Sequence, residues 1–158
     1  MIIRKAIAQD GAAIADFWTP QILETVVTFN SVPKTAQDVA DMIAQRPCFL
    51  VAEIAGTVVG FVTYDQFRGG VGYAHTMEHT IILAPKAQGQ GAGRALMEAA
   101  IQHARAADVH ALWAGVSAEN APAVAFHKSV GFEQIAVLPQ VGRKFERWMD
   151  LVLMQKRL

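Results

Sequence analysis

The chain has 158 residues, enough for one domain with a hydrophobic core of its own. Hydrophobic residues make up 53% and charged residues 18%, a balance that excludes an intrinsically disordered protein. Lys plus Arg and Asp plus Glu both number 14, so the net charge is zero and neither a nucleic-acid nor a membrane partner is expected. We predict a single domain over residues 1–158, and a chain without net charge has little protection against self-association.

The cysteine content and the N-terminal segment favour a cytoplasmic protein. Cys48 is the only cysteine, which excludes an intrachain disulfide, and its apolar neighbours predict an inert buried thiol. Residues 1–5 lack the apolar stretch of a secretory signal, and no apolar run approaches the ~18 residues that a membrane-spanning helix needs.

Capping signals and hydrophobic periodicity predict the helices and strands. The first half of the chain predicts a strand over 2–6, then a helix that is capped by Asp10 and interrupted or kinked at Pro20, and a helical segment ending near Phe29. A Thr35–Asp38 capping box predicts a helix over 36–45, and a hairpin of strands 48–54 and 58–67 follows. The second half predicts a loop over 68–72, a strand over 73–83, a helix over 94–107, a strand over 111–116, a short helix from Glu119–Asn120 to about Gly131, and strands over 132–138 and 148–155. This order is that of an α/β domain with a mixed sheet.

Three glycines, Gly89, Gly91 and Gly93, stand between the strand that ends near Leu83 and the helix that follows. Glycine permits close approach to the backbone, and the N–H groups and dipole of a helix N-terminus favour an anion such as a pyrophosphate. The Rossmann spacing is excluded because its third glycine would fall at Arg94, and a Walker loop is excluded because no Lys-Ser or Lys-Thr pair follows. A glycine-rich turn without a ligand is the alternative interpretation.

The remaining pattern, Q-x-x-G-x-G on Gln88, Gly91 and Gly93, resembles the acetyl-CoA pyrophosphate loop of GNAT-type N-acetyltransferases. The further matching segments are Ile3-Arg4-x-Ala6, Thr25-x-x-x-Phe29, Glu78-His79-Thr80, Asn120-Ala121 with His127, Gly131-Phe132, and the tail from Leu138-Pro139 through Gly142-x-Lys144-Phe145 and Trp148-x-Asp150 to Met154-Gln155. Together they resemble the phosphinothricin N-acetyltransferase group over nearly the whole chain. This resemblance implies a single GNAT-like domain, with a mixed, mostly antiparallel sheet flanked by helices and strands splayed around an acetyl-CoA cleft. It also implies a homodimer.

Glu78 is the candidate general base. Acetyl transfer to an amine requires a neutral amine, so a group must accept the ammonium proton directly or through water. Residues 78, 80 and 82 of the predicted strand share one face, and apolar neighbours favour a raised pKa for a carboxylate there. A structural carboxylate paired with an arginine is the alternative.

His127 is the second catalytic candidate. It follows Asn120 by seven residues, two helical turns, so both side chains are expected on one helix face. The resemblance places His127 where many GNAT enzymes have a tyrosine near the departing sulfur, which implies an acid for the thiolate or a member of a proton path. Asn120 is expected to bind the pantetheine arm, and a helix cap is its alternative role.

The cofactor is expected to contact mainly backbone. Ile81, Ile82 and Leu83 would offer strand N–H and C=O groups to the pantetheine amides, and Leu83 N–H could serve as an oxyanion donor. The pyrophosphate would be held by N–H groups of the glycine loop, which comprises Gly89, Gln90, Gly91, Ala92, Gly93 and Arg94.

No metal is expected. His75, Glu78 and His79 do not form H-E-x-x-H, and Glu78 and His79 point to opposite faces of a strand. His79 is instead expected to pack, to contact a second subunit or to belong to the acceptor site. The resemblance assigns the acceptor pocket to Phe29, Arg68, Tyr73, Glu78, His79 and Thr80.

The predicted activity is acetyl-CoA-dependent acetylation of the α-amine of a small amino-acid-like acceptor, by direct attack without a covalent intermediate. Phosphinothricin, methionine sulfoximine and methionine sulfone are the acceptors that the resemblance implies. Two alternatives stay open: a catalytically silent acyl-CoA sensor, and the same reaction on a polyamine, an aminoglycoside or a protein N-terminus.

Overall fold

The structure is a computed structural model that describes residues 1–158. Its seven strands form one sheet in the order β1-β2-β3-β4-β5-β7-β6. The strands are β1 (Ile2–Lys5), β2 (Cys48–Ile54), β3 (Thr57–Gln66), β4 (Thr76–Leu83), β5 (Ala111–Ser117), β6 (Glu133–Lys144) and β7 (Arg147–Arg157). Every neighbouring pair is antiparallel except β4 and β5, which confirms the predicted mixed, mostly antiparallel sheet.

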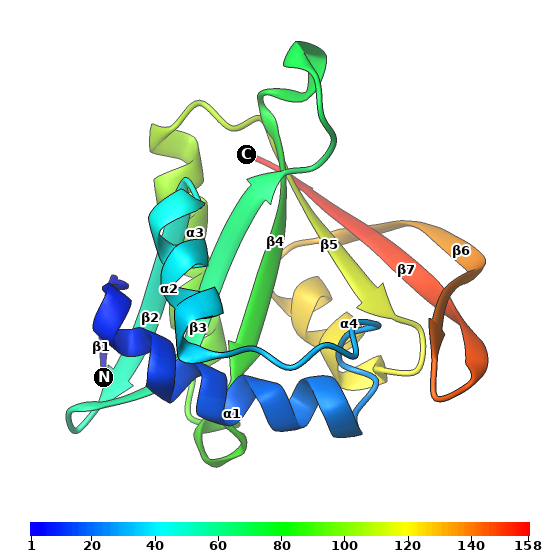
Figure 1. Cartoon of the computed structure of the whole chain (residues 1–158). Helices are drawn as coiled ribbons and strands as arrows, with labels where there is room; N and C mark the ends of the chain where they lie inside the picture. Colours follow the sequence, from blue (N-terminus) through cyan, green and yellow to red (C-terminus); the bar gives the residue numbers. More distant parts are fainter.

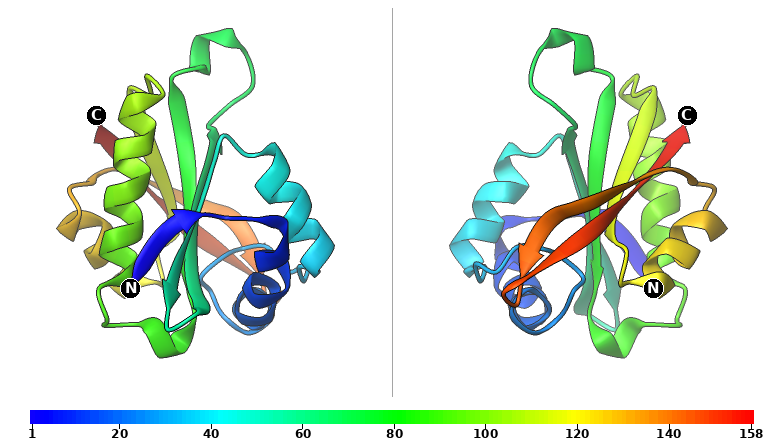
Figure 2. Two further views of the ribbon diagram at one scale, coloured as in Figure 1. Left: turned by 90° about the vertical axis from the view of Figure 1, so that its left-hand side faces the viewer. Right: turned by 90° about the vertical axis from the view of Figure 1, so that its right-hand side faces the viewer.

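Helices cover both faces of the sheet, as Figure 2 shows. Helices α1 (Gly11–Glu24) and α2 (Ala36–Gln45) lie on one face, and α3 (Ala92–Ala106) and α4 (Ala121–Ser129) on the other. Short 3-10 turns are η1 (Ala8–Asp10), η2 (Val71–Tyr73) and η3 (Pro85–Ala87). Each face has its own core, one built around Leu96 and Leu112 and the other around Ile14 and Phe61. No helix is both long and apolar enough to cross a membrane.

The two central parallel strands separate soon after they pair (Figure 1). β4 and β5 are in register only over residues 76–78 and 111–113. Beyond Glu78, the edge of β4 that faces β5 has no strand partner, although β3 still pairs with the other edge as far as Leu83. The predicted splayed strands are therefore present, and they leave backbone groups of β4 free in the middle of the sheet.

The prediction that Pro20 interrupts the first helix is wrong. Helix α1 continues through this residue to Glu24 because Ile14, Trp18 and Ile22, spaced four residues apart, are all buried on one face. Pro20 itself is exposed, so water can satisfy the carbonyl that loses its helical donor. The predicted helical segment up to Phe29 is also wrong, because the helix ends at Glu24 and residues 25–29 are irregular.

Several boundaries differ from the sequence prediction. β4 begins at Thr76 because residues 71–73 form a 3-10 turn, and α3 begins at Ala92, two residues early. β6 extends to Lys144 through two register shifts, and a turn at Phe145 and Glu146 joins it to β7. Both turn residues have positive φ, 51° and 59°, a conformation usually taken by Gly, Asn or Asp, so their sequence gives no hairpin signal.

Candidate active site

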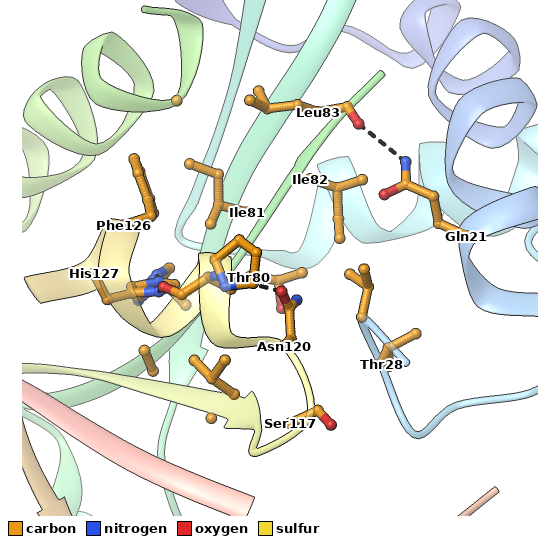
Figure 3. A pocket seen from close by; sticks show the side chains of 18 of the residues that line it. Gln21, Thr28, Thr80, Ile81, Ile82, Leu83, Ser117, Asn120, Phe126 and His127 are labelled. Carbon is orange, nitrogen blue, oxygen red and sulfur yellow. Dashed lines mark hydrogen bonds between the residues drawn. The ribbon is translucent and has the colours of Figure 1, made fainter. Parts of the chain in front are cut away.

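A cavity of about 710 Å³ opens where β4 and β5 diverge. This size is typical of a small-molecule site. Figure 3 shows that the wall formed by β4 faces α4 on one side, and that α1 with the segment after it closes the other side. The predicted residues that line the cavity are Phe29, Glu78, His79, Thr80, Ile81, Ile82, Leu83, Gly89, Gly93, Asn120 and His127. Residues far apart in the chain thus meet at one opening of the sheet.

The unpaired edge of β4 presents backbone polar groups to this cavity. Ala84 N–H donates to Val59 O of β3 at 2.8 Å. Because the backbone groups of successive residues in a strand point to opposite edges, those of Ile82 also face β3. The backbone groups of Ile81 and Leu83 therefore face the cavity. Leu83 O already accepts from the side-chain amide of Gln21 at 3.0 Å (Figure 3). The edge can therefore pair with an extended ligand that carries amide groups, and Ile82 contributes its buried side chain rather than its backbone.

The glycine loop and the start of α3 close one end of the cavity. Gly89 and Gly91 have φ of 75° and 81°, and nothing lies within 4 Å of the Cβ that either would carry, so space in front of both is open. Gly91 is the N-cap residue directly before α3, and the first N–H groups of a helix have no helical acceptor. Gly93 sits against α4, since its Cβ would lie 3.3 Å from the Phe126 ring. These free N–H groups and the helix dipole suit a phosphate.

The other residues of the glycine loop do not line the cavity themselves. Gln90, Gly91, Ala92 and Arg94 are not among the residues that line the cavity, although they adjoin Gly89 and Gly93, which are. The Arg94 guanidinium lies 3.3 Å from Ser129 Oγ at the end of α4.

Glu78 carries a carboxylate without a partner. It forms none of the five ion pairs and none of the side-chain hydrogen bonds of the structure, which excludes the predicted alternative of an arginine-paired carboxylate. Burial raises the pKa of Glu78 above its ordinary value. A Cβ on Gly115 of β5 would lie 2.9 Å from Glu78 Oε1, so the glycine leaves room for the carboxylate. A half-buried, unpaired carboxylate in a cavity is suited to accept a proton.

The pH dependence of turnover should report this pKa. Because only ionised Glu78 can accept a proton, we expect kcat/KM to rise with pH through an ionisation whose midpoint lies above the ordinary value of 4.5. The measurement is kcat/KM for CoA release over a pH series. The Glu78→Gln variant is the control and should lose this acid limb. A midpoint at or below the ordinary value would contradict the assignment.

His127 and His79 form a buried pair. Their Nε2 atoms lie 3.0 Å apart, His127 Nδ1 is 2.7 Å from Ala123 O, and His79 Nδ1 is 2.9 Å from Trp113 O. Carbonyl oxygens only accept, so these three hydrogen bonds need three protons, whereas two neutral imidazoles carry two. Burial lowers the pKa of both residues, that of His79 to about 3, which favours the neutral rings. The pair in its neutral form is therefore one proton short of its hydrogen bonds.

Asn120 is the cap of α4, the alternative role predicted for it. Its Oδ1 accepts from Ala123 N–H at 3.2 Å and caps α4, and its side chain also lines the cavity (Figure 3). Asn120 precedes α4 as its cap, and both Asn120 and His127 line the cavity. His79 is 6% exposed and packs against His127, so it leaves no surface for a contact with a second subunit.

The predicted acceptor residues fall into two groups. Phe29, Glu78, His79 and Thr80 line the cavity. Arg68 and Tyr73 do not, because they lie in the segment between β3 and β4 that projects beyond the sheet in Figure 1. There the Arg68 guanidinium lies 5.7 Å from the centre of the Tyr73 ring.

The further polar or aromatic residues that line the cavity without a sequence signal include Trp18, Gln21, Thr28 and Ser117. Gln21 and Trp18 lie on a helix whose pattern indicates only a core-facing side. Thr28 lies in the segment that the sequence predicts as helical up to Phe29, whereas the helix ends at Glu24. Ser117 lies one residue beyond the predicted end of its strand.

Comparison with known proteins identifies the class of this site. The model of the acetyltransferase (GNAT) family matches residues 16–132, which include β4, the glycine loop and α4. The chain belongs to the GNAT acetyltransferase family and is an acetyltransferase.

Individual relatives match over almost their full length. The chain is 35% identical to the L-methionine sulfoximine/L-methionine sulfone acetyltransferase of Salmonella typhimurium, covering 100% of this chain and 95% of the relative. Among solved structures, a ribosomal-protein-alanine N-acetyltransferase from Brucella melitensis is 37% identical with a TM-score of 0.96, and all of both chains is covered. The structure of yncA from Salmonella typhimurium with its cofactor acetyl-CoA is 34% identical, with a TM-score of 0.94 over 99% of this chain and 93% of that one.

Proposed function

We propose that this chain transfers the acetyl group of acetyl-CoA to the α-amine of a small amino-acid-like acceptor of the phosphinothricin, methionine sulfoximine or methionine sulfone type. One observation carries the proposal: an unpaired, half-buried carboxylate, Glu78, lies in the same cavity as the glycine-rich start of α3 and the free edge of β4. A base and a cradle for a phosphorylated amide chain are the parts that this reaction requires. The names of the methionine sulfoximine relative and of the acetyl-CoA-bound neighbour support it.

The cofactor would use backbone groups of the glycine loop and of β4, among which Gln90 N–H and Leu83 O already have a partner within the chain. When bound, acetyl-CoA supplies the activated thioester. We propose that the N–H groups of Gly89 to Arg94 hold its pyrophosphate, that the Ile81 and Leu83 backbone pairs with its amides, and that Leu83 N–H faces the oxyanion. Asn120 would contact the pantetheine arm of the cofactor from the start of α4.

The chain's own residues would then manage protons. Glu78 accepts a proton from the attacking amine, directly or through water, while Phe29 and Thr80 help to position the acceptor. Both ring nitrogens of His127 are engaged, by Ala123 O and by His79 Nε2, so direct donation to the thiolate would require Nε2 to leave His79. We therefore propose that the His79–His127 pair, which lacks one proton for its hydrogen bonds, belongs to the proton path and does not itself protonate the thiolate.

A panel of amines tests this function. We expect acetyl-CoA to raise the melting temperature, and free CoA thiol to appear when L-methionine sulfoximine, L-methionine sulfone or phosphinothricin is added, with the N-acetyl product confirmed by mass spectrometry. Thermal stabilisation without thiol release on any amine would support a silent sensor instead. If acetyl-CoA does not raise the melting temperature and no amine leads to thiol release, the proposal is refuted.

A protein N-terminus is the second candidate acceptor. It is favoured by the likeness to the ribosomal-protein-alanine N-acetyltransferase structure. A peptide that begins with alanine belongs in the same panel, and faster acetylation of this peptide than of the free amino acids would establish the second candidate over the first.

We also propose that the protein is a homodimer. Exposed apolar side chains follow the edge strand β6, the turn after it and the start of β7: Ile135, Val137, Val141, Phe145 and Trp148. An unpaired edge with such side chains favours association, and a neutral chain does not oppose it. Arg68 and Tyr73 lie outside the cavity of their own chain, so their proposed acceptor contact requires the cavity of a second copy. Light scattering should give twice the 17.1 kDa chain mass, and a monomer at micromolar concentration would refute the dimer.

A further inference from the structure

The acceptor side of the cavity is closed by a segment without secondary structure. Residues 25–30 follow the end of α1, and four of them, Val27, Thr28, Phe29 and Asn30, line the cavity. The segment has two internal hydrogen bonds, from Val27 N–H to Thr25 Oγ1 and from Asn30 N–H to Thr28 Oγ1, but none of the repeated backbone hydrogen bonds of a helix or strand. Its position, and with it the shape of the acceptor pocket, therefore depends on contacts with other elements.

Lys144 at the end of β6 supplies such contacts. Its side chain is 5% exposed, and its Nζ donates to Ile22 O at 2.5 Å, Thr25 O at 2.6 Å and Thr28 O at 2.8 Å. Three acceptors use all three N–H groups of an ammonium. Ile22 O belongs to the last turn of α1, where carbonyls lack helical donors and the dipole favours a cation. Lys144 forms no ion pair, and apart from the Phe145 ring, whose centre lies 5.2 Å from Nζ, its charge faces this backbone.

Gly142 provides a second point of contact on the same strand. It lies two residues before Lys144, so both face the same side of β6. The Phe29 ring occupies the place where a Cβ on Gly142 would stand. Any side chain at position 142 would displace the aromatic residue that forms the cavity wall. Gly142 and Lys144 thus contact the two ends of the stretch from Ile22 to Phe29.

We propose that Lys144, together with Gly142, is a positioning residue for the acceptor: it fixes the 25–30 segment so that Phe29 and Thr28 form the acceptor wall. This inference rests on the proposed function, since it assigns the acceptor to this side of the cavity. Lys144 touches neither the glycine loop nor the free edge of β4, so its effect falls on the acceptor and not on acetyl-CoA. It also gives a role to the Gly142-x-Lys144 part of the C-terminal sequence motif.

The test is Lys144→Met, which keeps side-chain length and removes the three hydrogen bonds. We expect the acceptor KM to rise at least tenfold while the Kd of acetyl-CoA stays within twofold. The matched control is Arg143→Met on the neighbouring residue, whose side chain is exposed over Trp148, and both constants should stay within twofold of wild type. An unchanged acceptor KM, or an equal loss of acetyl-CoA affinity, would overturn the proposal. If Lys144→Met does not fold, Gly142→Ala takes its place with the same expected split.

Amide hydrogen exchange separates this inference from the proposed function. In the folded variant, residues 25–30 should exchange faster than in wild type and in Arg143→Met, while α3 and β4 are unchanged. If wild type acetylates no amine but the exchange of residues 25–30 still rises in the Lys144 variant, the proposed function fails while the inference that Lys144 fixes this segment stands. If the exchange of 25–30 does not rise, the inference about Lys144 is wrong whatever the acceptor.

Discussion

Replacement of Glu78 by glutamine should lower kcat by about 10²–10⁴-fold, the range typical of a lost general base. The amide is nearly isosteric but cannot accept the amine proton. Burial without a charged partner is what raises the pKa of Glu78, so the substitution leaves no stranded cation behind and the fold should be retained. Acetyl-CoA should still raise the melting temperature as in wild type, because its proposed contacts are to backbone groups and to Asn120 and do not involve Glu78.

Asp65→Asn is the matched control for this variant. Asp65 lies directly opposite Glu78 on β3, but its carboxylate is 56% exposed and 3.5 Å from Arg46. Loss of this surface pair should leave kcat within about twofold, since exposed ion pairs contribute little. Equal turnover by Glu78→Gln and wild type would remove Glu78 from the mechanism and favour a base outside this strand.

Replacement of Gly91 by alanine should weaken acetyl-CoA binding at least tenfold. With φ of 81°, alanine at this position costs about 1–2 kcal/mol of backbone strain, and its Cβ would project into the open space before α3. Each lost hydrogen bond to a charged group costs about 1.5–3 kcal/mol, which corresponds to tenfold or more in affinity. Calorimetric titration with CoA gives the Kd directly.

Gly56→Ala is the control that separates strain from binding. Gly56 turns the β2–β3 hairpin with φ of 76°, and its Cβ would also meet nothing within 4 Å. Both variants should lose similar stability in denaturant, but only Gly91→Ala should lose affinity. Equal CoA affinity in the two variants would contradict a pyrophosphate site at the glycine loop.

The parts of the site that follow from local sequence were predictable. The strand that carries Glu78, the cap of α4 at Asn120 and the glycines at the start of α3 all follow from local patterns. In each case neighbouring residues alone determine the geometry. The splayed strands came from the family resemblance rather than from periodicity.

The parts that depend on distant residues were not predictable. The His79–His127 contact joins residues 48 apart, and Lys144 reaches the end of α1 from more than 100 residues away. In sequence, Lys144 stands between Arg143 and Phe145 and has no pattern that distinguishes it from a surface lysine. The helix is not interrupted at Pro20 because the burial of Ile22 on the α1 face outweighs the lost hydrogen bond. The positions of Arg68 and Tyr73 depend on a projecting loop that no local signal describes.

The central claim is that acceptor and acetyl-CoA meet in this one cavity and react directly. The most direct test is the initial rate of CoA release as L-methionine sulfoximine and acetyl-CoA are both varied. Direct attack in a ternary complex predicts double-reciprocal lines that intersect. Parallel lines, with an acetylated protein after incubation with acetyl-CoA alone, would contradict it and show that the acetyl group first passes to the enzyme.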